Sequence, residues 1–217
     1  MNKVLITGFQ NFGDYSENTT EVLKKNVRLI SSHAVEYMIF PVRIFSNGAE
    51  NYGKQIIARA KEINAKAIIS LGMASDVRGL RIKSRAINWV ENEKYCLPEE
   101  HKRVLDKNLP PKYELDVDLS RWQMKEILSV LSKINVVYET EISTDANAFC
   151  CNALMFRTLQ AMQESEYDIP YIYLQLPCTA NAVKNLPKFD KNKHITSVCQ
   201  VSQILSIFTL LYKRCKI

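Results

Sequence analysis

The feature that most constrains the fold is the largely apolar run at residues 65–71, which Gly72 ends. A strand of this composition must be covered on both faces of its sheet. Residues 3–7 and 34–42 predict two further strands, and residues 21–29 and 51–63 predict helices between them. Strands that alternate with helices in this way are typical of a parallel or mixed sheet with helices on its faces.

The rest of the chain continues this pattern. Residues 97–116 are polar and contain three prolines, so we expect a long surface excursion there, of the kind that often serves as a lid or an interface arm. The sequence has no internal repeat and no linker rich in Gly or Ser, and residues 1–217 are therefore expected to form a single α/β domain. The other expected elements are strands at residues 81–89, 136–138 and 170–176 and helices at residues 120–133, 151–162 and 198–212.

Charge and cysteine content argue against several classes of protein. The 29 basic and 23 acidic residues give a net charge of +6, but the basic residues are scattered among acidic ones, so we expect no nucleic-acid binding. The 6 cysteines show no C-x-x-C spacing, so no metal site and no cofactor are expected. No apolar stretch reaches about 18 residues and no signal peptide is evident, so we expect no membrane association and a cytoplasmic location.

The first candidate motif is the turn after the first strand, Thr-Gly-Phe-Gln-Asn-Phe-Gly-Asp at residues 7–14, with Asn18 shortly after it. Taken alone, it is a glycine-bearing turn whose Phe9 and Phe12 could simply fill the core.

The second candidate motif is Ile-Ser-Thr-Asp-Ala-Asn-Ala-Phe-Cys-Cys-Asn at residues 142–152, where Cys151 is expected to open a helix. A helix N-terminus favours a thiolate and any oxyanion formed beside it. The alternative interpretation is a buried structural cysteine, which is the commoner role of a lone thiol.

Taken together, and with Pro41, Gly72 and Asn88 in their places between them, the two motifs resemble those of the pyroglutamyl peptidase (pyrrolidone carboxyl peptidase) family over nearly the whole chain. The Gly-Phe-x-Pro-Phe-Gly run of the family is met except that Asn11 replaces the proline. The Ser-x-x-Ala-Gly-x-x-x-Cys-Asn run is met except that Asn147 replaces the glycine.

The resemblance implies a three-layer α/β/α sandwich with a mixed sheet, assembled into dimers or tetramers. It also implies removal of N-terminal pyroglutamate from peptides by a Cys–His–Glu triad, without a cofactor. By the resemblance, Cys151 is the nucleophile, Phe9 and Phe12 clamp the flat lactam ring, and Asn18 is placed to hydrogen-bond the lactam amide.

The chain departs from the family at the other two triad positions. Gln175 stands where the family has its His, and Lys83 stands where it has its Glu. A basic residue that the family carries ten positions later falls on Glu93, or on Lys94 if the loop slips by one. Because Gln175 has no titratable group near neutral pH, it cannot accept the thiol proton. Loss of the general base costs about 10²–10⁴-fold in rate.

Two interpretations of Lys83 remain open. The ammonium could lie near Cys151 and lower the pKa of the thiol or act as its base. Alternatively, it could point away, or pair with Glu91 or Glu93. None of the three histidines falls at a triad position; they are His33, His101 and His194.

The sequence therefore predicts a pyroglutamyl peptidase with weak or no turnover. The alternative is a non-catalytic binding protein for a pyroglutamyl or lactam-like ligand on the same scaffold. A nucleoside phosphorylase would share the sandwich, but the sequence has no glycine-rich loop to hold its phosphate.

Overall fold

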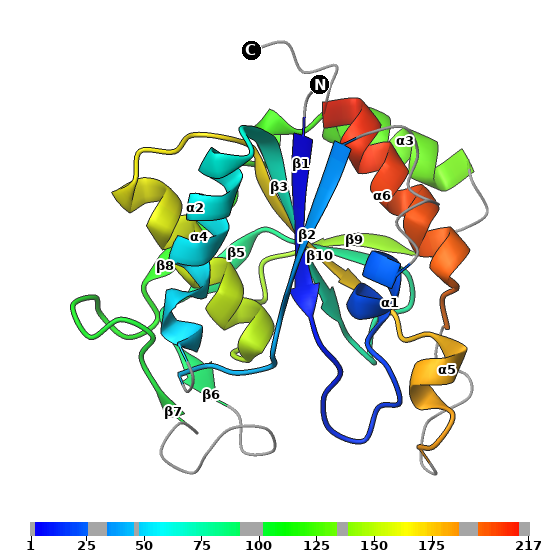
Figure 1. Cartoon of the computed structure of the whole chain (residues 1–217), viewed down its shortest axis with the longest axis horizontal. Coiled ribbons are helices and arrows are strands. Elements are labelled where there is room, and N and C mark those ends of the chain that lie inside the picture. The colour runs from blue at the N-terminus through cyan, green and yellow to red at the C-terminus, as the bar shows by residue number, and fades with distance from the viewer. Residues whose placement is uncertain are drawn as a thin grey trace.

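The computed structural model describes residues 3–25, 34–45, 48–91, 102–133, 139–186 and 195–212. Within these ranges a 6-stranded sheet of order β2-β1-β3-β10-β4-β9 forms the centre (Figure 1). β2, β1, β3 and β10 are parallel, β4 runs antiparallel to β10, and β9 is parallel to β4, so the expected mixed sheet is confirmed. The strands are β1 (Lys3–Phe9), β2 (Ala34–Phe40), β3 (Ala65–Met73), β4 (Leu80–Lys83), β9 (Thr140–Ser143) and β10 (Tyr171–Leu176).

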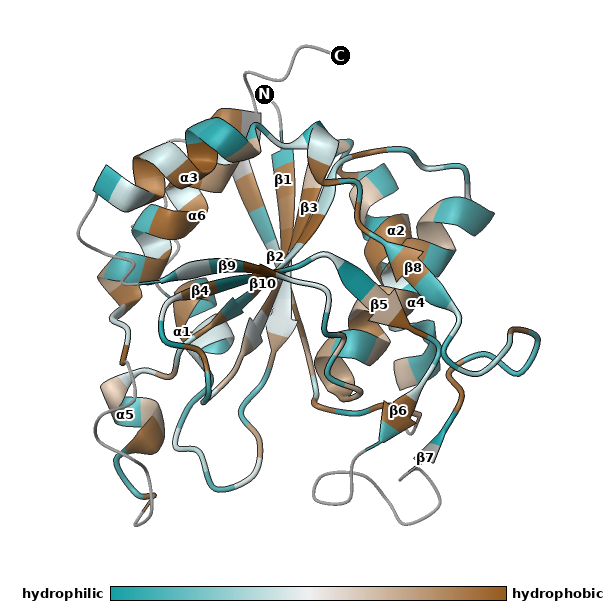
Figure 2. Cartoon of the chain, turned by 180° about the vertical axis from the view of Figure 1, so that it is seen from behind, coloured by the Kyte–Doolittle hydropathy of each residue, from teal (hydrophilic) through white to brown (hydrophobic). Residues whose placement is uncertain are grey.

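Helices cover both faces of this sheet (Figures 1 and 2). On one face lie α2 (Tyr52–Glu62) and α4 (Cys150–Glu164), and on the other lie α1 (Thr19–Lys25), α3 (Met124–Lys133) and α6 (Val198–Tyr212). The three-layer α/β/α sandwich is therefore confirmed. No helix within the described residues is long and apolar enough to cross a membrane.

The strand period of two divides the side chains of β10 between two cores. Tyr171 and Tyr173 pack into the core beneath α2 and α4, whereas Ile172 and Leu174 pack into the core beneath α3 and α6. Gln175, two residues after Tyr173, therefore projects toward α4. This alternation decides which polar side chains of the sheet face the helix that begins at Cys150.

The prediction of a single strand at residues 81–89 is wrong. β4 ends at Lys83, and the Ser84 N–H donates to the carbonyl of Ser143 at 2.9 Å, while the Val117 N–H donates to the Ser84 carbonyl at 2.8 Å. The chain thus leaves the main sheet at Ser84. It continues as β5 (Arg85–Ile87), which pairs antiparallel with β8 (Glu114–Asp116).

The surface excursion expected at residues 97–116 is more ordered than predicted where the structure describes it. β7 (Lys102–Arg103) pairs with β6 (Val90–Glu91), and the Asn88 side chain donates to the carbonyls of Asp106, Leu109 and Pro110. A buried amide therefore holds the returning loop against the sandwich.

Several boundaries also differ from the predicted ones. The helix expected from residue 120 begins as a 3₁₀ turn (Leu119–Arg121) before α3, and β9 and the short α5 (Ala180–Val183) were not predicted. The strand expected at residues 136–138 and the last part of the helix expected at 21–29 lie outside the described residues.

Candidate functional site

The three residues at the triad positions come from three elements that meet near one end of the sheet. Gln175 pairs in register with Gly72 of β3, and Lys83 pairs with Tyr173 across the β4–β10 ladder. α4 begins at Cys150, so Cys151 lies in its first turn, and its Sγ lies beside Gly72 near the carboxyl ends of β3 and β10. The carboxyl ends of parallel strands are where open α/β sheets bind their ligands.

Cys151 and Tyr173 both lie against the backbone of Gly72. A Cβ atom added at Gly72 would stand 2.8 Å from the Cys151 Sγ and 2.7 Å from the Tyr173 Oη. Any residue other than glycine would therefore push the thiol or the hydroxyl away. Tyr173 is a site residue that sequence reasoning missed; the available signal was its position two residues before Gln175, on the same face of the strand.

Gln175 lies close enough to Cys151 to lower the pKa of the thiol. Its Oε1 accepts from Arg81 Nη1 at 3.4 Å, and Arg81 is itself fixed by ion pairs with Asp76 and Glu141. With the carbonyl end of the amide turned to Arg81, the NH₂ end is left for the thiol. Gln175 can thus stabilise a thiolate but cannot take its proton.

Burial raises the pKa of the Cys151 thiol. The Tyr173 hydroxyl, the Gln175 amide and the positive charge of Lys83 oppose this effect but do not overcome it. This direction is opposite to the one that the helix N-terminus alone would give.

Lys83 is 2% exposed, and its Nζ has no hydrogen-bond partner among the described residues. Burial lowers the pKa of this ammonium, while Asp145 and Cys151 act in the opposite direction. The interpretation in which Lys83 points away and pairs with Glu91 is therefore wrong. Glu93 and Lys94, and all three histidines, lie outside the described residues.

The two phenylalanines of the first motif separate in the structure. Phe9 is buried in the core with Tyr52 and Phe156, whereas the half-buried Phe12 lies 5.1 Å from Tyr15 and 6.5 Å from Phe149, measured between ring centroids. Phe149 is the N-cap of α4, two residues before Cys151. Phe149 thus joins Phe12 near the start of α4, and sequence reasoning missed this aromatic side chain.

Asn18 is fully buried and holds the loop between β1 and α1. Its Oδ1 accepts from the backbone N–H and the hydroxyl of Thr20, each at 2.9 Å, and its Nδ2 donates to the Gln10 carbonyl at 3.0 Å. These bonds cap α1 and fix the position of Phe12 in the loop. A contact between Asn18 and a lactam amide stays a prediction.

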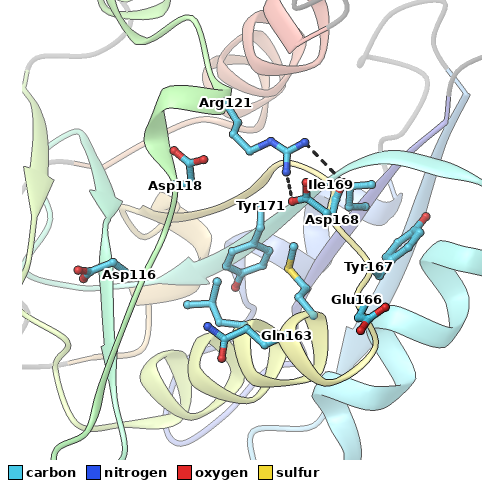
Figure 3. A pocket seen from close by; sticks show the side chains of 11 residues that line it. Asp116, Asp118, Arg121, Gln163, Glu166, Tyr167, Asp168, Ile169 and Tyr171 are labelled. Atoms are coloured by element: carbon cyan, nitrogen blue, oxygen red, sulfur yellow. Dashed lines mark hydrogen bonds and ion pairs between the residues drawn. The ribbon is translucent and has the colours of Figure 1, made fainter. Parts of the chain in front are cut away.

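A separate cavity of about 370 Å³ opens at the other end of α4 (Figure 3). Carboxylates dominate its rim, and Arg121 pairs there with Asp168. The residues of α4 that line it, Leu159, Met162 and Gln163, lie roughly 12–18 Å along the helix from Cys151 at 1.5 Å per residue. It is not part of the Cys151 site.

Comparison with known proteins places this geometry in one family. The sequence pattern of the family described as pyroglutamyl peptidase matches residues 2–207. Curated relatives include the pyrrolidone-carboxylate peptidase of Thermococcus litoralis, 26% identical over 95% of this chain and 90% of the relative. Another is that of Oceanobacillus iheyensis, 26% identical over 87% of this chain and 92% of the relative.

Solved structures agree in fold. The pyrrolidone carboxyl peptidase of Thermococcus litoralis superposes with a TM-score of 0.78, at 22% identity over 98% of this chain and 94% of that protein. A mutant pyrrolidone carboxyl peptidase from Pyrococcus furiosus superposes with a TM-score of 0.77, at 17% identity over 99% of this chain. With the sequence match spanning nearly all of its length, the chain belongs to the pyroglutamyl peptidase family.

Proposed function

We propose that this protein is a cysteine peptidase that acts on N-terminal pyroglutamate with very low turnover at neutral pH. The observation that carries the proposal is the meeting of Cys151, Gln175 and Lys83 at the carboxyl edge of the sheet, with Gly72 leaving room for the thiol. The nucleophile position is kept, but the groups around it differ from a His–Glu pair.

Lys83 is the group best suited to take the thiol proton. Since burial lowers the pKa of Lys83, its neutral amine, which can take a proton, forms at a lower pH than in an exposed lysine, and its fraction grows as the pH rises. The Cys151 Sγ then attacks the pyroglutamyl carbonyl carbon, the peptide nitrogen leaves with a proton, and water hydrolyses the thioester to release pyroglutamate. Turnover through this route should rise between pH 7 and pH 9.

The lactam ring would lie beside Phe12 and Phe149, since Phe149 stands two residues before Cys151 and its ring centroid lies 6.5 Å from that of Phe12. Phe9 and Asn18 would contribute to ligand binding only indirectly. Both are buried and hold the two ends of the loop that carries Phe12. Flat apolar rings beside the ligand suit a planar lactam.

A non-catalytic binding protein for a pyroglutamyl or lactam-like ligand is the second candidate. It is favoured by the raised pKa of the Cys151 thiol and by an amide in place of a base at Gln175. By family resemblance we also propose a single-domain, cytoplasmic protein that assembles into dimers or tetramers. Sedimentation at micromolar concentration, giving only a species near 25.0 kDa, would contradict the assembly.

Both candidates require a pocket beside Cys151 that can hold a lactam. Alkylation tests whether this pocket exists. Iodoacetamide at pH 9 should label Cys151, and 2-pyrrolidone or pyroglutamate should slow this labelling. The exposed Cys199 in the same molecule serves as the internal control and should react at an unchanged rate. Equal rates at Cys151 with and without the lactam would rule out the pocket and both candidates with it.

A further inference from the structure

A second cavity, of about 480 Å³, lies between the beginning of α2, the middle of α4 and the segment at residues 103–108. Its volume is within the range of small-molecule sites. It is lined by side chains that take no part in the Cys151 site, and the cationic ones are Lys54, Arg103, Lys107 and Arg157.

Arg157 is the unusual residue of this cavity. It is 6% exposed, and its Nη1 donates to the carbonyls of Ile44 and Ala49, but its Nη2 has no hydrogen-bond partner among the described residues. Burial lowers the pKa of Arg157 to about 10, so the guanidinium remains charged at neutral pH. A buried cation of this kind is costly unless an anion compensates it.

A second guanidinium packs against the same aromatic ring as that of Arg157. The Arg103 Cζ stands 3.4 Å from the centroid of the Phe45 ring, and the Arg157 Cζ stands 5.2 Å from the same centroid. Two positive groups around one ring repel one another, and the proximity of Arg103 further lowers the pKa of Arg157. An anion bound in the cavity that both arginines line would relieve this repulsion.

The carboxylates of the cavity compensate the charge of Arg157 only in part. Asp106 accepts from the Asn108 N–H at 2.8 Å and from the Gln160 side chain at 2.5 Å, and Glu164 lies 4.0 Å from Lys54. Glu50 is exposed and acts on Arg157 only through its charge, with no ion pair between them in the described part of the chain.

We propose that this cavity binds an oxyanion, the carboxylate or phosphate group of a small molecule, through the free Nη2 of Arg157 and the guanidinium of Arg103. The fork geometry of guanidinium matches both groups. Lys54 and Lys107 on the lining add positive charge around the bound anion. The inference does not depend on the proposed peptidase function, because no residue of the Cys151 site takes part.

Calorimetric titration of the whole chain at pH 7.5 and constant ionic strength tests the inference, with inorganic phosphate and acetate as probes. We expect saturable binding of at least one probe. Arg157→Met should weaken it at least tenfold, which corresponds to about 1.4 kcal/mol. Arg78→Met, which removes an exposed arginine outside the cavity, is the matched control and should bind as the wild type does.

Tighter binding of phosphate would identify a phosphorylated ligand, and tighter binding of acetate would identify a carboxylate; either supports the site. If Arg157→Met does not fold, Arg103→Met takes its place and should also weaken binding. The absence of saturation at about 10 mM of both probes, ten times a millimolar Kd, would overturn the inference. Unchanged affinity in the folded variant would overturn it equally.

Discussion

Replacing Lys83 by methionine should stabilise the protein while it makes Cys151 less reactive. Methionine keeps most of the length of the side chain and removes an ammonium that is buried without a hydrogen-bond partner. Exchanging buried charged groups for apolar ones of similar volume stabilises proteins by about 1–4 kcal/mol in favourable cases. We expect roughly 1–3 kcal/mol here, since Asp145 offsets part of the burial cost.

This gain should depend on pH in a defined direction. The pKa of Lys83 in the folded chain lies below its ordinary value of 10.5, so between the two values the unfolded chain binds more protons than the folded one. The penalty from Lys83 is therefore complete below the folded pKa and disappears as the pH approaches 10.5. Lys83→Met should stabilise most near neutral pH and have little effect at high pH.

Thermal and urea unfolding measure this effect directly. For a chain of this size each kcal/mol shifts the Tm by about 2–4 °C, so the Tm should rise by roughly 2–12 °C at pH 7. The exposed Lys125→Met on α3 is the control and should change stability by less than about 0.5 kcal/mol. Alkylation of Cys151 should slow in Lys83→Met only, because the charge of Lys83 lowers the pKa of the thiol.

The opposite result would refute the reasoning. If Lys83→Met lost more than about 1 kcal/mol at pH 7, the ammonium would have a strong anionic partner in solution, as removal of one member of a buried ion pair does. Lys83 would then be a structural cation and no candidate for the proton acceptor of Cys151.

Three further changes test single parts of the structure. Gly72→Ala should lower the free energy of unfolding by about 1–3 kcal/mol through overpacking and slow Cys151 alkylation, since the new Cβ would collide with the thiol and the Tyr173 hydroxyl. A urea midpoint and a labelling rate equal to those of the wild type would contradict the close approach. Asn18→Ala should cost about 1 kcal/mol through loss of the α1 cap, read as a lower urea midpoint, and an unchanged midpoint would show that the cap contributes nothing. Tyr173→Phe should raise the pKa of Cys151, seen as a shift of its alkylation profile to higher pH, and an unshifted profile would remove the hydroxyl from the site.

The sequence predicted the parts of the fold that depend on local pattern. The apolar runs of β1, β3 and β10 and the alternation along β10 follow from the strand period, and they fix which face carries Gln175. β9 was not predicted because it is a half-exposed edge strand, in which Ile142 is 48% exposed, and its composition is not apolar.

The site was predicted only in part, for a related reason. The motifs supplied the positions of Cys151, Lys83 and Gln175, but the burial of Lys83 and the approach of Tyr173 to Gly72 result from α4 packing across the sheet. The direction of the pKa shift at Cys151 depends on that burial. Local sequence, which placed the thiol at a helix N-terminus, indicated the opposite direction.

The hydrolysis of a pyroglutamyl-aminomethylcoumarin substrate tests the central claim most directly. The wild-type chain should release the fluorophore at least 10²-fold more slowly than the Thermococcus litoralis enzyme under identical conditions, which is the lower end of a general-base contribution of about 10²–10⁴. The double change Lys83→Glu with Gln175→His should raise the rate, and a further Cys151→Ala should abolish it. Wild-type turnover within about tenfold of the Thermococcus enzyme would contradict the claim that this site lacks an effective base.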